Sequence, residues 1–521
     1  MNTNTAFNYL HHFCEAAIKY IALVPLVLLT ILTSFFQSTV MFHWYETCTI
    51  TRNGPKFFIL LIIGLLLLTI VCKGLDRIPE LGMFIVLAVV YLLAGFYLIG
   101  NMNYQLRDDA LSCYTNAWNF YIGDYSNIYP GSYLYRVPHQ LGLMVYESLL
   151  INISEDPIFL CRVNLIWIIL TNLFIWQSAR LTYEKAPLTR KIVILLTFAF
   201  LPNLFYLFFV YGTVPGFACL IIALYFTIRT LKKNCKWSLF LSLVFMSIAC
   251  MVKKNFLIGG IALILVYLVT YLKKQQLLHI AAIAGLACTL IVPNRLLISR
   301  YESLTGSTLT NGMPSTLYIA MGLQENINDW CAFGWYNHFN DATYNSTNYD
   351  AELSSQIAKE SIMERLGTFA SDPGYAFSFF REKLITTWCE PTFQSIWSGP
   401  STVDAYNSTE VSFLADIYAS GSAFFLLASA MNVLVVAIFL FAVIYVVWKT
   451  FRNREALNPL ELFCLIYFVG GFLFHLIWET KSQYVYPYVM ILIPLAAGGL
   501  RICLSRLPKI SHRLFAFQKK K

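Results

Sequence analysis

The chain contains the run Met83-Phe-Ile-Val-Leu-Ala-Val-Val-Tyr-Leu-Leu-Ala-Gly-Phe-Tyr-Leu-Ile-Gly100, in which no residue is charged. About 20 apolar residues cross a bilayer as a helix, because each adds about 1.5 Å of length. The run does not alternate between apolar and polar residues, which excludes a strand of a membrane barrel. It predicts a helix that spans a membrane.

Composition extends this prediction to the whole chain. Hydrophobic residues make up 58% of the 521 residues, charged residues only 12%, and mean hydropathy is +0.61. The sequence therefore predicts an all-α polytopic membrane protein with about twelve transmembrane helices. We expect these helices to begin near Tyr20, Phe57, Met83, Ile158, Ile192, Gly212, Ser238, Phe256, Ile280, Phe424, Leu460 and Tyr484.

The distribution of Lys and Arg predicts the orientation, because these residues remain preferentially on the cytoplasmic side. With both termini inside, most basic clusters face the cytoplasm, and 101–156 and 301–421 lie outside. The apolar segment 140–150 is too short to span and is expected to be interfacial or re-entrant. We therefore divide the chain into helices 1–9 with the first large outer loop (1–300), an extracytoplasmic domain, mixed or mainly helical (301–421), and helices 10–12 with a basic tail (422–521).

Two adjacent acids, Asp108 and Asp109, follow the run that ends at Gly100. Downstream, Tyr135-Arg-Val-Pro-His-Gln-Leu-Gly142 supplies hydrogen-bonding and cationic side chains, namely Arg136, His139 and Gln140. A carboxylate near cations could deprotonate an acceptor hydroxyl while the cations hold a phosphate leaving group. The alternative is that acids just outside a span only remain hydrated.

Three lysines fall in short outer turns, where positive charge is disfavoured: Lys253, Lys254 and Lys481. Lysine at headgroup depth forms strong charge-assisted bonds to phosphate oxygens, which indicates a phosphate or pyrophosphate site. The alternative is that these side chains reach toward ordinary lipid headgroups. In the outer segment, Trp330, Trp335 and Tyr336 are candidates for sugar contact, and packing is the alternative for such aromatic residues.

Several motifs in a fixed order resemble the GT-C superfamily of polyprenyl-phosphate-sugar glycosyltransferases. The likeness is greatest to the branch of protein O-mannosyltransferases and aminoarabinose transferases, and to cell-envelope enzymes of Gram-positive bacteria. The motifs that carry it are Arg107-Asp-Asp-Ala110, Gly123-Asp-Tyr-Ser126, Val137-Pro-His-Gln-Leu-Gly142, Met321-Gly-Leu-Gln324, Gly334-Trp-Tyr-Asn337, Trp388-Cys-Glu-Pro-Thr392 and Trp478-Glu-Thr-Lys-Ser-Gln-Tyr-Val-Tyr-Pro487.

The resemblance implies transfer of a sugar from a polyprenyl-phosphate donor to a glycan, teichoic acid or glycolipid acceptor, with inversion at the anomeric carbon. It implies that Asp108 or Asp109 is the base, and that outer basic residues hold the donor phosphate. The last motif adds Glu479, Tyr484 and Tyr486 as candidate substrate contacts. Two features depart from the family: an extra pair of amino-terminal spans, and Lys481 and Gln483 where related sequences often carry arginine.

No cofactor is expected, although a divalent metal is left open. The thirteen cysteines have no zinc-ligand spacing, and Cys331 and Cys389 could pair only in an oxidising compartment. The glycine pairs Gly259-Gly260 and Gly470-Gly471 lack the strand–turn–helix context of a phosphate-binding loop, so no nucleotide site is expected. The net charge of +9 follows from membrane topology, with no nucleic-acid recognition motif.

Two other functions remain open. A polysaccharide polymerase or ligase of the O-antigen type also combines about twelve spans with a large outer loop. A lipid-linked oligosaccharide flippase is the other, but its coupling acids are expected at the membrane midplane, and the two halves of this chain show no convincing repeat.

Overall fold

A computed structural model describes residues 3–42, 46–306, 308–309, 312–325, 332–401, 403–453 and 455–506. Helices form nearly all of the regular structure in these ranges, and the only strands there form one two-stranded hairpin. The predicted all-α polytopic fold class is confirmed.

Ten helices within the described ranges are long and apolar enough to span a membrane. They are α1 (Thr3–Phe35), α2 (Pro55–Gly74), α3 (Glu80–Gly100), α7 (Ile158–Thr182), α10 (Thr213–Lys233), α12 (Leu257–Lys274), α13 (Leu277–Thr305), α20 (Ser422–Trp448), α21 (Pro459–Ile477) and α23 (Ile493–Arg506), the last preceded by α22 (Tyr486–Met490). A further apolar pair, α8 (Pro187–Ala199) and α9 (Pro202–Phe205) with η3 (Tyr206–Phe208), is bent by 48° and forms either a broken span or a re-entrant loop. The shorter apolar helix α11 (Lys236–Val252) accounts for the twelfth predicted segment.

The remaining helices connect these spans. The first large loop contains α4 (Asp108–Tyr121), α5 (Tyr133–Arg136), η2 (Pro138–Gln140) and α6 (Leu141–Ile151). The long segment after α13 contains α14 (Ser315–Gly322), α15 (Phe339–Ser346), α16 (Ala351–Ser371), α17 (Pro373–Trp388), α18 (Ala405–Ser408) and α19 (Ser412–Tyr418). Short turns of helix are η1 (Leu75–Arg77), η4 (Lys254–Phe256), η5 (Lys449–Asn453) and η6 (Ser482–Tyr484).

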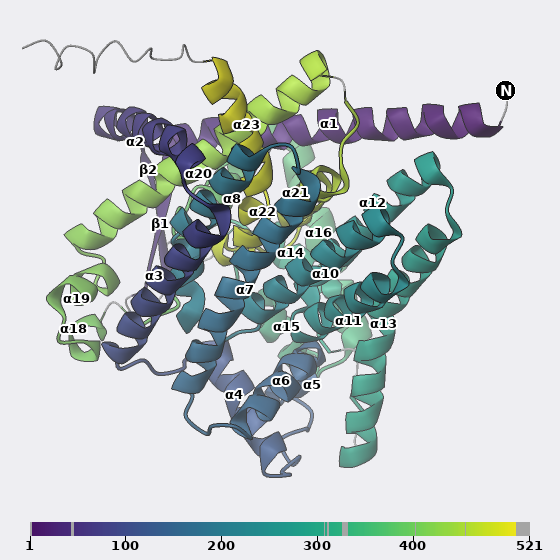
Figure 1. Ribbon diagram of the computed structural model, residues 1–521. Coiled ribbons are helices and arrows are strands. Elements are labelled where there is room, and N and C mark those ends of the chain that lie inside the picture. The colour runs from purple at the N-terminus through teal and green to yellow at the C-terminus, as the bar shows by residue number, and fades with distance from the viewer. Residues whose placement is uncertain are drawn as a thin grey trace, which may run out of the picture.

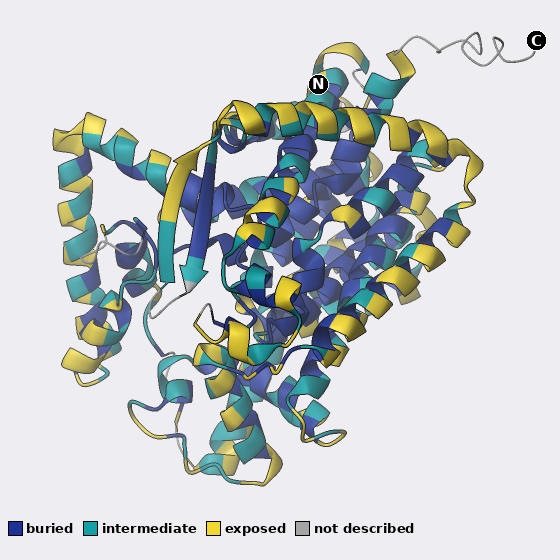
Figure 2. Ribbon diagram, turned by 90° about the vertical axis from the view of Figure 1, so that its left-hand side faces the viewer, coloured by how far each residue is buried: buried dark blue, intermediate teal, exposed yellow. Residues whose placement is uncertain are grey.

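A hairpin that the sequence analysis did not predict joins α1 to α2. Its strands β1 (Phe36–Phe42) and β2 (Glu46–Arg52) pair antiparallel, from Phe36 opposite Arg52 to Phe42 opposite Glu46. Figure 2 shows β1 buried against the protein and β2 more exposed. The backbone N–H of Ser38 donates to Cys389 O at 3.0 Å, which fixes the hairpin to the end of α17.

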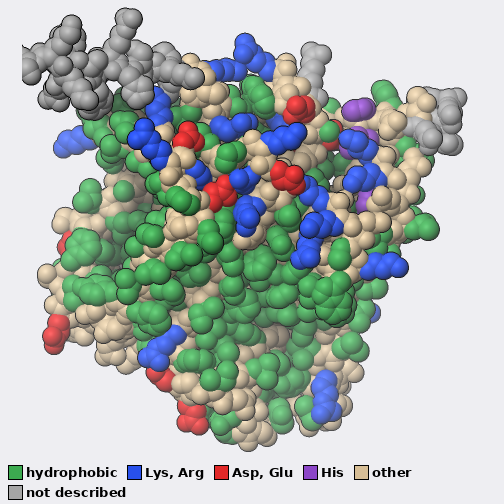
Figure 3. Space-filling view, viewed as in Figure 1, with side chains coloured by type: hydrophobic (Ala, Val, Ile, Leu, Met, Phe, Trp, Pro, Cys, Tyr) green, Lys and Arg blue, Asp and Glu red, His purple; other side chains and the backbone are tan. Residues whose placement is uncertain are grey.

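The two ends of the helix bundle differ in charge. In Figure 1, α4, α5 and α6 lie at one end, and α1 and α23 lie toward the other. Figure 3 shows hydrophobic side chains over the middle of this face and Lys and Arg gathered toward the end with α1 and α23. We call these the α4 end and the basic end.

Helix α17 enters the protein interior at its carboxyl end. Phe377, near the start of the helix, is 69% exposed. Trp388, however, is 1% exposed, and its ring lies 5.9 Å from that of Phe468 and 6.0 Å from that of Phe472 in α21. Burial of this large ring ties the end of α17, and the turn that follows it, to the spans.

Candidate functional site

The two adjacent acids lie in different environments at the start of α4. Asp108 has a positive φ of 52°, a conformation that Asp adopts more readily than most residues. Its side chain is 59% exposed and lies 3.7 Å from Arg107, whose guanidinium lies 4.4 Å from the Trp397 ring centroid. Asp109 instead accepts a hydrogen bond from the Tyr211 hydroxyl at 2.9 Å. The two carboxylates therefore have different surroundings.

Tyr211 connects the acid to a lysine and an amide. Its hydroxyl accepts a hydrogen bond from Gln140 Nε2 at 2.6 Å and lies 3.5 Å from the Tyr133 hydroxyl. The Lys253 ammonium lies 3.3 Å from the centroid of the Tyr211 ring, a cation–π contact. This group, which we call the Tyr211 wall, brings predicted residues from three separate segments together.

Two glycines make this wall possible. Gly142 follows the Gln140 turn, and a Cβ there would lie 2.0 Å from Met251 O. Gly212 has a positive φ of 75°, and its Cβ would lie 2.7 Å from Val252 O. Because only glycine permits both approaches, α6 and the start of α10 reach the backbone just before Lys253.

Lys253 is a buried cation without a carboxylate partner. It is 8% exposed, and among the described residues its ammonium takes part in no ion pair or hydrogen bond. Burial lowers its pKa to about 8, and neighbouring acids, Asp109 and Glu479 included, oppose that shift. Removing an unpaired ammonium from water is costly. The position therefore favours binding of an anion.

His139 and Lys254 adjoin this wall. Burial, together with the charges of Lys254 and Lys253, lowers the pKa of His139 to about 3, so its imidazole is neutral at pH 7. A neutral imidazole both donates and accepts a hydrogen bond. Lys254 is exposed, unlike its neighbour Lys253.

A second wall forms around Glu479, which follows α21. Glu479 is 6% exposed, and its Oε1 has no hydrogen-bond partner in the described part of the chain. Burial raises its pKa to about 7, against the lowering effect of Lys481 and Lys383. Its carboxyl is consequently close to half protonated near neutral pH, so it can donate or accept a proton.

Motifs far apart in the sequence hold this second wall in place. The backbone N–H of Thr480 donates to Gly334 O at 3.0 Å, and a Cβ at Gly322 would lie 2.4 Å from Ile477 O. The Lys383 ammonium donates to Gly322 O at 2.5 Å and Trp478 O at 2.9 Å. Burial lowers the pKa of Lys383 to about 7.

The hairpin contributes Glu46 to this wall. Glu46 accepts a hydrogen bond from the Lys481 ammonium, which lies 5.9 Å from the Trp335 ring centroid and 5.8 Å from that of Tyr336. Its other carboxylate oxygen accepts from Gln394 Nε2 at 2.8 Å. We call the set Glu479, Lys481, Glu46, Trp335 and Tyr336 the Glu479 wall.

The charge of Asp109 reaches both walls. Burial is the main cause of the raised pKa of Glu479, Tyr336 and Tyr484, and the Asp109 carboxylate raises each of the three further. The same carboxylate raises the pKa of Lys253 against the effect of burial. Asp109 thus acts electrostatically between the two walls.

Other predicted residues take different positions. Arg136 pairs with Asp341, which also accepts a hydrogen bond from the Tyr336 hydroxyl at 2.7 Å. Tyr484 is half-buried, with its ring 5.9 Å from that of His475. Tyr486 lies in the core, 4.3 Å from the Tyr206 ring.

Two residues of the outer segment, Trp330 and Cys331, lie outside the described residues. Cys389 is buried at the end of α17. Across the described ranges no group of three or more His, Cys, Asp or Glu could hold a metal ion.

Sequence reasoning missed three residues that shape the site: Tyr211, Glu46 and Glu390. Glu390 accepts hydrogen bonds from Gln394 N at 2.6 Å and Ser482 Oγ at 3.0 Å, joining the turn after α17 to η6. The sequence did contain a signal for Glu46. Acids are rare in this chain, and Glu46, like Asp109, lies in a predicted outer loop. Tyr211 carried none, since it lies in a run rich in aromatic residues.

The sequence profile of the dolichyl-phosphate-mannose-protein mannosyltransferase family matches residues 146–294. The match supports a place in the GT-C superfamily. It supports a multi-pass membrane glycosyltransferase and, with it, a lipid-linked donor. The matched region includes Tyr211 and Lys253 but not the two acids Asp109 and Glu479. No curated protein and no solved structure matches the chain.

The raised pKa of Glu479 predicts a pH-dependent stability. A carboxyl with an unfolded pKa near 4.5 and a folded pKa of about 7 stabilises the fold at low pH, and this contribution is lost as pH rises through about 7. Glu479→Gln keeps the group neutral, so its melting temperature relative to wild type should increase from about pH 5 to about pH 8.

The measurement is thermal unfolding of both proteins in detergent across this pH range. Glu410→Gln is the control. Because Glu410 is exposed, the melting temperature of this variant relative to wild type should not change with pH. A pH-independent difference for Glu479→Gln would contradict a raised pKa.

Proposed function

We propose that the protein transfers a sugar from a polyprenyl-phosphate donor to a hydroxyl of a cell-envelope acceptor, with inversion, on the extracytoplasmic face. The observation that carries this proposal is the Tyr211 wall. There the exposed Asp109 carboxylate accepts a hydrogen bond from the Tyr211 hydroxyl, and the buried Lys253 ammonium, which has no counter-ion among the described residues, lies over the ring of the same tyrosine. These are the two groups that the reaction requires.

Asp109 is proposed as the general base. Its carboxylate accepts the proton of the acceptor hydroxyl while the hydroxyl oxygen bonds to the anomeric carbon. The bond between that carbon and the phosphate oxygen breaks in the same step, and the polyprenyl phosphate leaves with both bonding electrons. One displacement inverts the anomeric centre. The hydrogen bond from Tyr211 orients the carboxylate.

Lys253 is proposed to bind the donor phosphate. A phosphate supplies the negative charge that the buried ammonium lacks, and the bond strengthens as the leaving group gains charge. Gln140 and the neutral His139 add hydrogen-bonding capacity beside it. Lys254, exposed at the same turn, extends the positive field. Arg136 is paired with Asp341, so it adds hydrogen-bond donors without net charge.

The Glu479 wall is proposed to receive the sugar and the far side of the phosphate. Lys481 lies near two aromatic rings, Trp335 and Tyr336. Trp335 is 1% exposed, so the half-buried Tyr336 is the ring proposed to stack on the sugar. The Glu479 carboxyl, with an unpaired oxygen and a pKa near 7, can hydrogen-bond a sugar hydroxyl in either protonation state. Tyr484 lies beside this wall.

The proposed side of the membrane follows from charge. Lys and Arg gather at the basic end, which the positive-inside tendency places in the cytoplasm. The α4 end, with Asp109, then faces outward, where a lipid-linked sugar and a wall glycan, teichoic acid or glycolipid of a Gram-positive envelope meet. A donor already activated on lipid requires no nucleotide site.

Asp109→Asn is expected to lower the rate of sugar transfer by about 10²–10⁴-fold, because a general base contributes about this factor. Donor binding should persist. Asp108→Asn is the matched control and should retain most activity, because Asp108 is exposed and turned toward Arg107. The measurement is single-turnover transfer from a synthetic polyprenyl-phosphate sugar. Full transfer by Asp109→Asn would refute the assignment of the base.

Lys253→Gln is expected to raise KM for the lipid-phosphate donor by about 10–100-fold, the equivalent of one charged hydrogen bond. The acceptor KM should change little. Lys236→Gln is the control, because Lys236 is exposed at the opposite end of the same helix. Steady-state kinetics at varied donor concentration measure both, and an unaltered donor KM would show that Lys253 only reaches toward ordinary lipid.

Glu46→Gln tests whether the hairpin positions Lys481. We expect donor KM to rise severalfold in the wild-type background and no further in Lys481→Gln, since the carboxylate acts through that ammonium. Arg52→Gln, an exposed change on the same strand, should leave donor KM unaltered. Additive effects of Glu46→Gln and Lys481→Gln would mean that Glu46 only stabilises the hairpin.

A further inference from the structure

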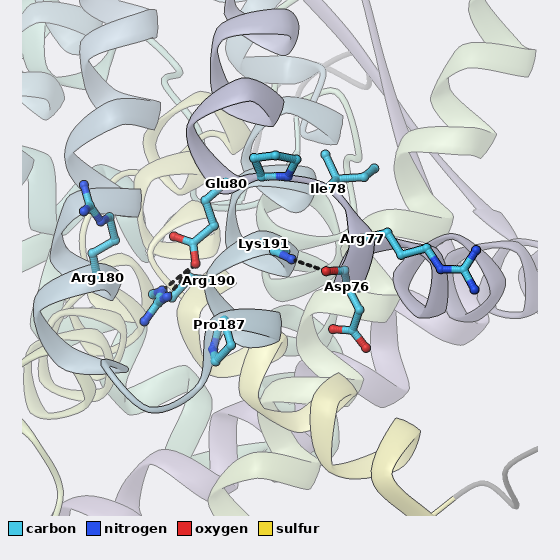
Figure 4. Close-up of a pocket in the computed structure, with 9 residues that line it drawn as sticks. Asp76, Arg77, Ile78, Glu80, Arg180, Pro187, Arg190 and Lys191 are labelled. Carbon is cyan, nitrogen blue, oxygen red and sulfur yellow. Dashed lines mark hydrogen bonds and ion pairs between the residues drawn. The ribbon is translucent and has the colours of Figure 1, made fainter.

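A pocket of about 540 Å³ opens at the basic end, where η1 leads into α3 and α7 leads into α8. Six charged residues line it, and Figure 4 shows them: Asp76, Arg77, Glu80, Arg180, Arg190 and Lys191. The four cations outnumber the two acids, so the lining carries excess positive charge. No motif of the sequence analysis and no step of the proposed reaction uses this pocket.

The pocket is remote from the candidate site. Helix α3 begins at Glu80 beside the pocket, and after 21 residues it ends at Gly100, shortly before Asp109. At about 1.5 Å per residue the helix separates the two by about 30 Å, the thickness of a bilayer core. A ligand here would therefore meet the opposite membrane surface.

One acid of the pocket is already neutralised. Glu80 Oε1 accepts hydrogen bonds from Arg190 Nε at 2.8 Å and Nη2 at 2.6 Å. The Trp176 indole lies 3.4 Å from the other carboxylate oxygen. This ion pair, with two guanidinium N–H groups on one carboxylate oxygen, fixes the start of α3 against α8 and leaves Glu80 little capacity to balance another cation.

Lys191 is the cation that lacks a counter-ion. It is 8% exposed, and its ammonium donates to two backbone oxygens, Leu75 O and Asp76 O, both at 2.9 Å. None of the ion pairs formed by the described residues involves Lys191. Figure 4 shows the Asp76 carboxylate turned away from this ammonium. The buried charge is solvated by dipoles but not neutralised.

Two exposed arginines stand at the rim of the same pocket. The Arg180 guanidinium lies 5.2 Å from the Trp176 ring centroid and donates from Nη1 to Gln177 Oε1 at 3.3 Å. Arg77 is exposed at the end of η1. Figure 4 shows the two side chains on opposite sides of Lys191, with that of Arg77 extending away from it. To reach a phosphate at the Lys191 ammonium, these long exposed side chains would turn inward, and guanidinium groups bind phosphate in a bidentate manner.

We propose that this pocket binds a phosphate group, with Lys191 at its floor and Arg77 and Arg180 at its rim. Its volume exceeds that of a phosphate ion and accommodates a phospholipid headgroup. Its position at the end of the apolar helix α3 lies at headgroup depth, where basic pockets between transmembrane helices bind anionic lipids. The same chemistry would admit a soluble phosphate compound.

The test compares lipid binding by purified wild type, Arg77→Gln/Arg180→Gln and the matched control Lys233→Gln/Lys236→Gln. Both pairs are exposed, and the control pair lies at the same end, beside the Lys232–Glu184 ion pair. Native mass spectrometry measures binding of dioleoyl phosphatidylglycerol against dioleoyl phosphatidylcholine, and a second arm adds inorganic phosphate. Thermal unfolding of each variant verifies the fold.

We expect wild type and control to prefer the anionic lipid, and Arg77→Gln/Arg180→Gln to bind it about tenfold more weakly. If inorganic phosphate raises the thermal unfolding temperature of wild type, and wild type shows no preference between the two lipids, the phosphate site is supported and its ligand is a soluble phosphate compound. An equal loss of anionic-lipid binding in both double variants would indicate that surface charge alone binds the lipid, and it would overturn the proposal. Absence of binding to either probe would also overturn it.

Discussion

A buried ammonium that lacks a carboxylate is the constraint on which the candidate site depends. Lys253 rests on the Tyr211 ring, and the same tyrosine holds Asp109. A cation–π contact stabilises an ammonium without cancelling its charge, so an anion still gains by approaching. A carboxylate in direct contact would have filled that position and excluded a phosphate. Tyr211 keeps the Asp109 carboxylate and the Lys253 ammonium close together but unpaired.

Close backbone contacts assemble the walls together with the buried side chains of Lys383 and Lys481. Gly142 and Gly212 let the chain approach the end of α11, Gly322 does the same for the turn after α21, and Gly334 lets its segment approach Gly322 O. A side chain at these positions would force the segments apart and change the spacing between Asp109 and Glu479. This explains why motifs separated by hundreds of residues carry the resemblance as an ordered set.

Hydropathy was sufficient to predict the helical spans, because lipid leaves a backbone no other economical way to satisfy its hydrogen bonds. It could not predict the hairpin, since β1 contains the polar run Gln37, Ser38 and Thr39, which looks like a loop. All three are buried: Ser38 bonds to the end of α17, and Gln37 accepts a hydrogen bond from Asn432 in α20. These tertiary contacts are absent from local sequence. The acids were found by their rarity, whereas Tyr211 was hidden among other aromatic residues. That Asp109, and not Asp108, bonds to Tyr211 could not be read from the sequence, which does not reveal the positive φ of Asp108.

Charge compensation separates the two lysines in the site. Lys481 is paired with Glu46 and held beside Trp335 and Tyr336, whereas Lys253 has no acidic partner among the described residues. The unpaired Lys253 gives the candidate site a preference for one negative group. The paired Lys481 adds hydrogen-bond donors without adding net charge. With both lysines unpaired, the empty site would bear the cost of two buried charges. The hairpin that joins α1 to α2 therefore lets a second lysine lie beside Trp335 and Tyr336 at little cost to stability.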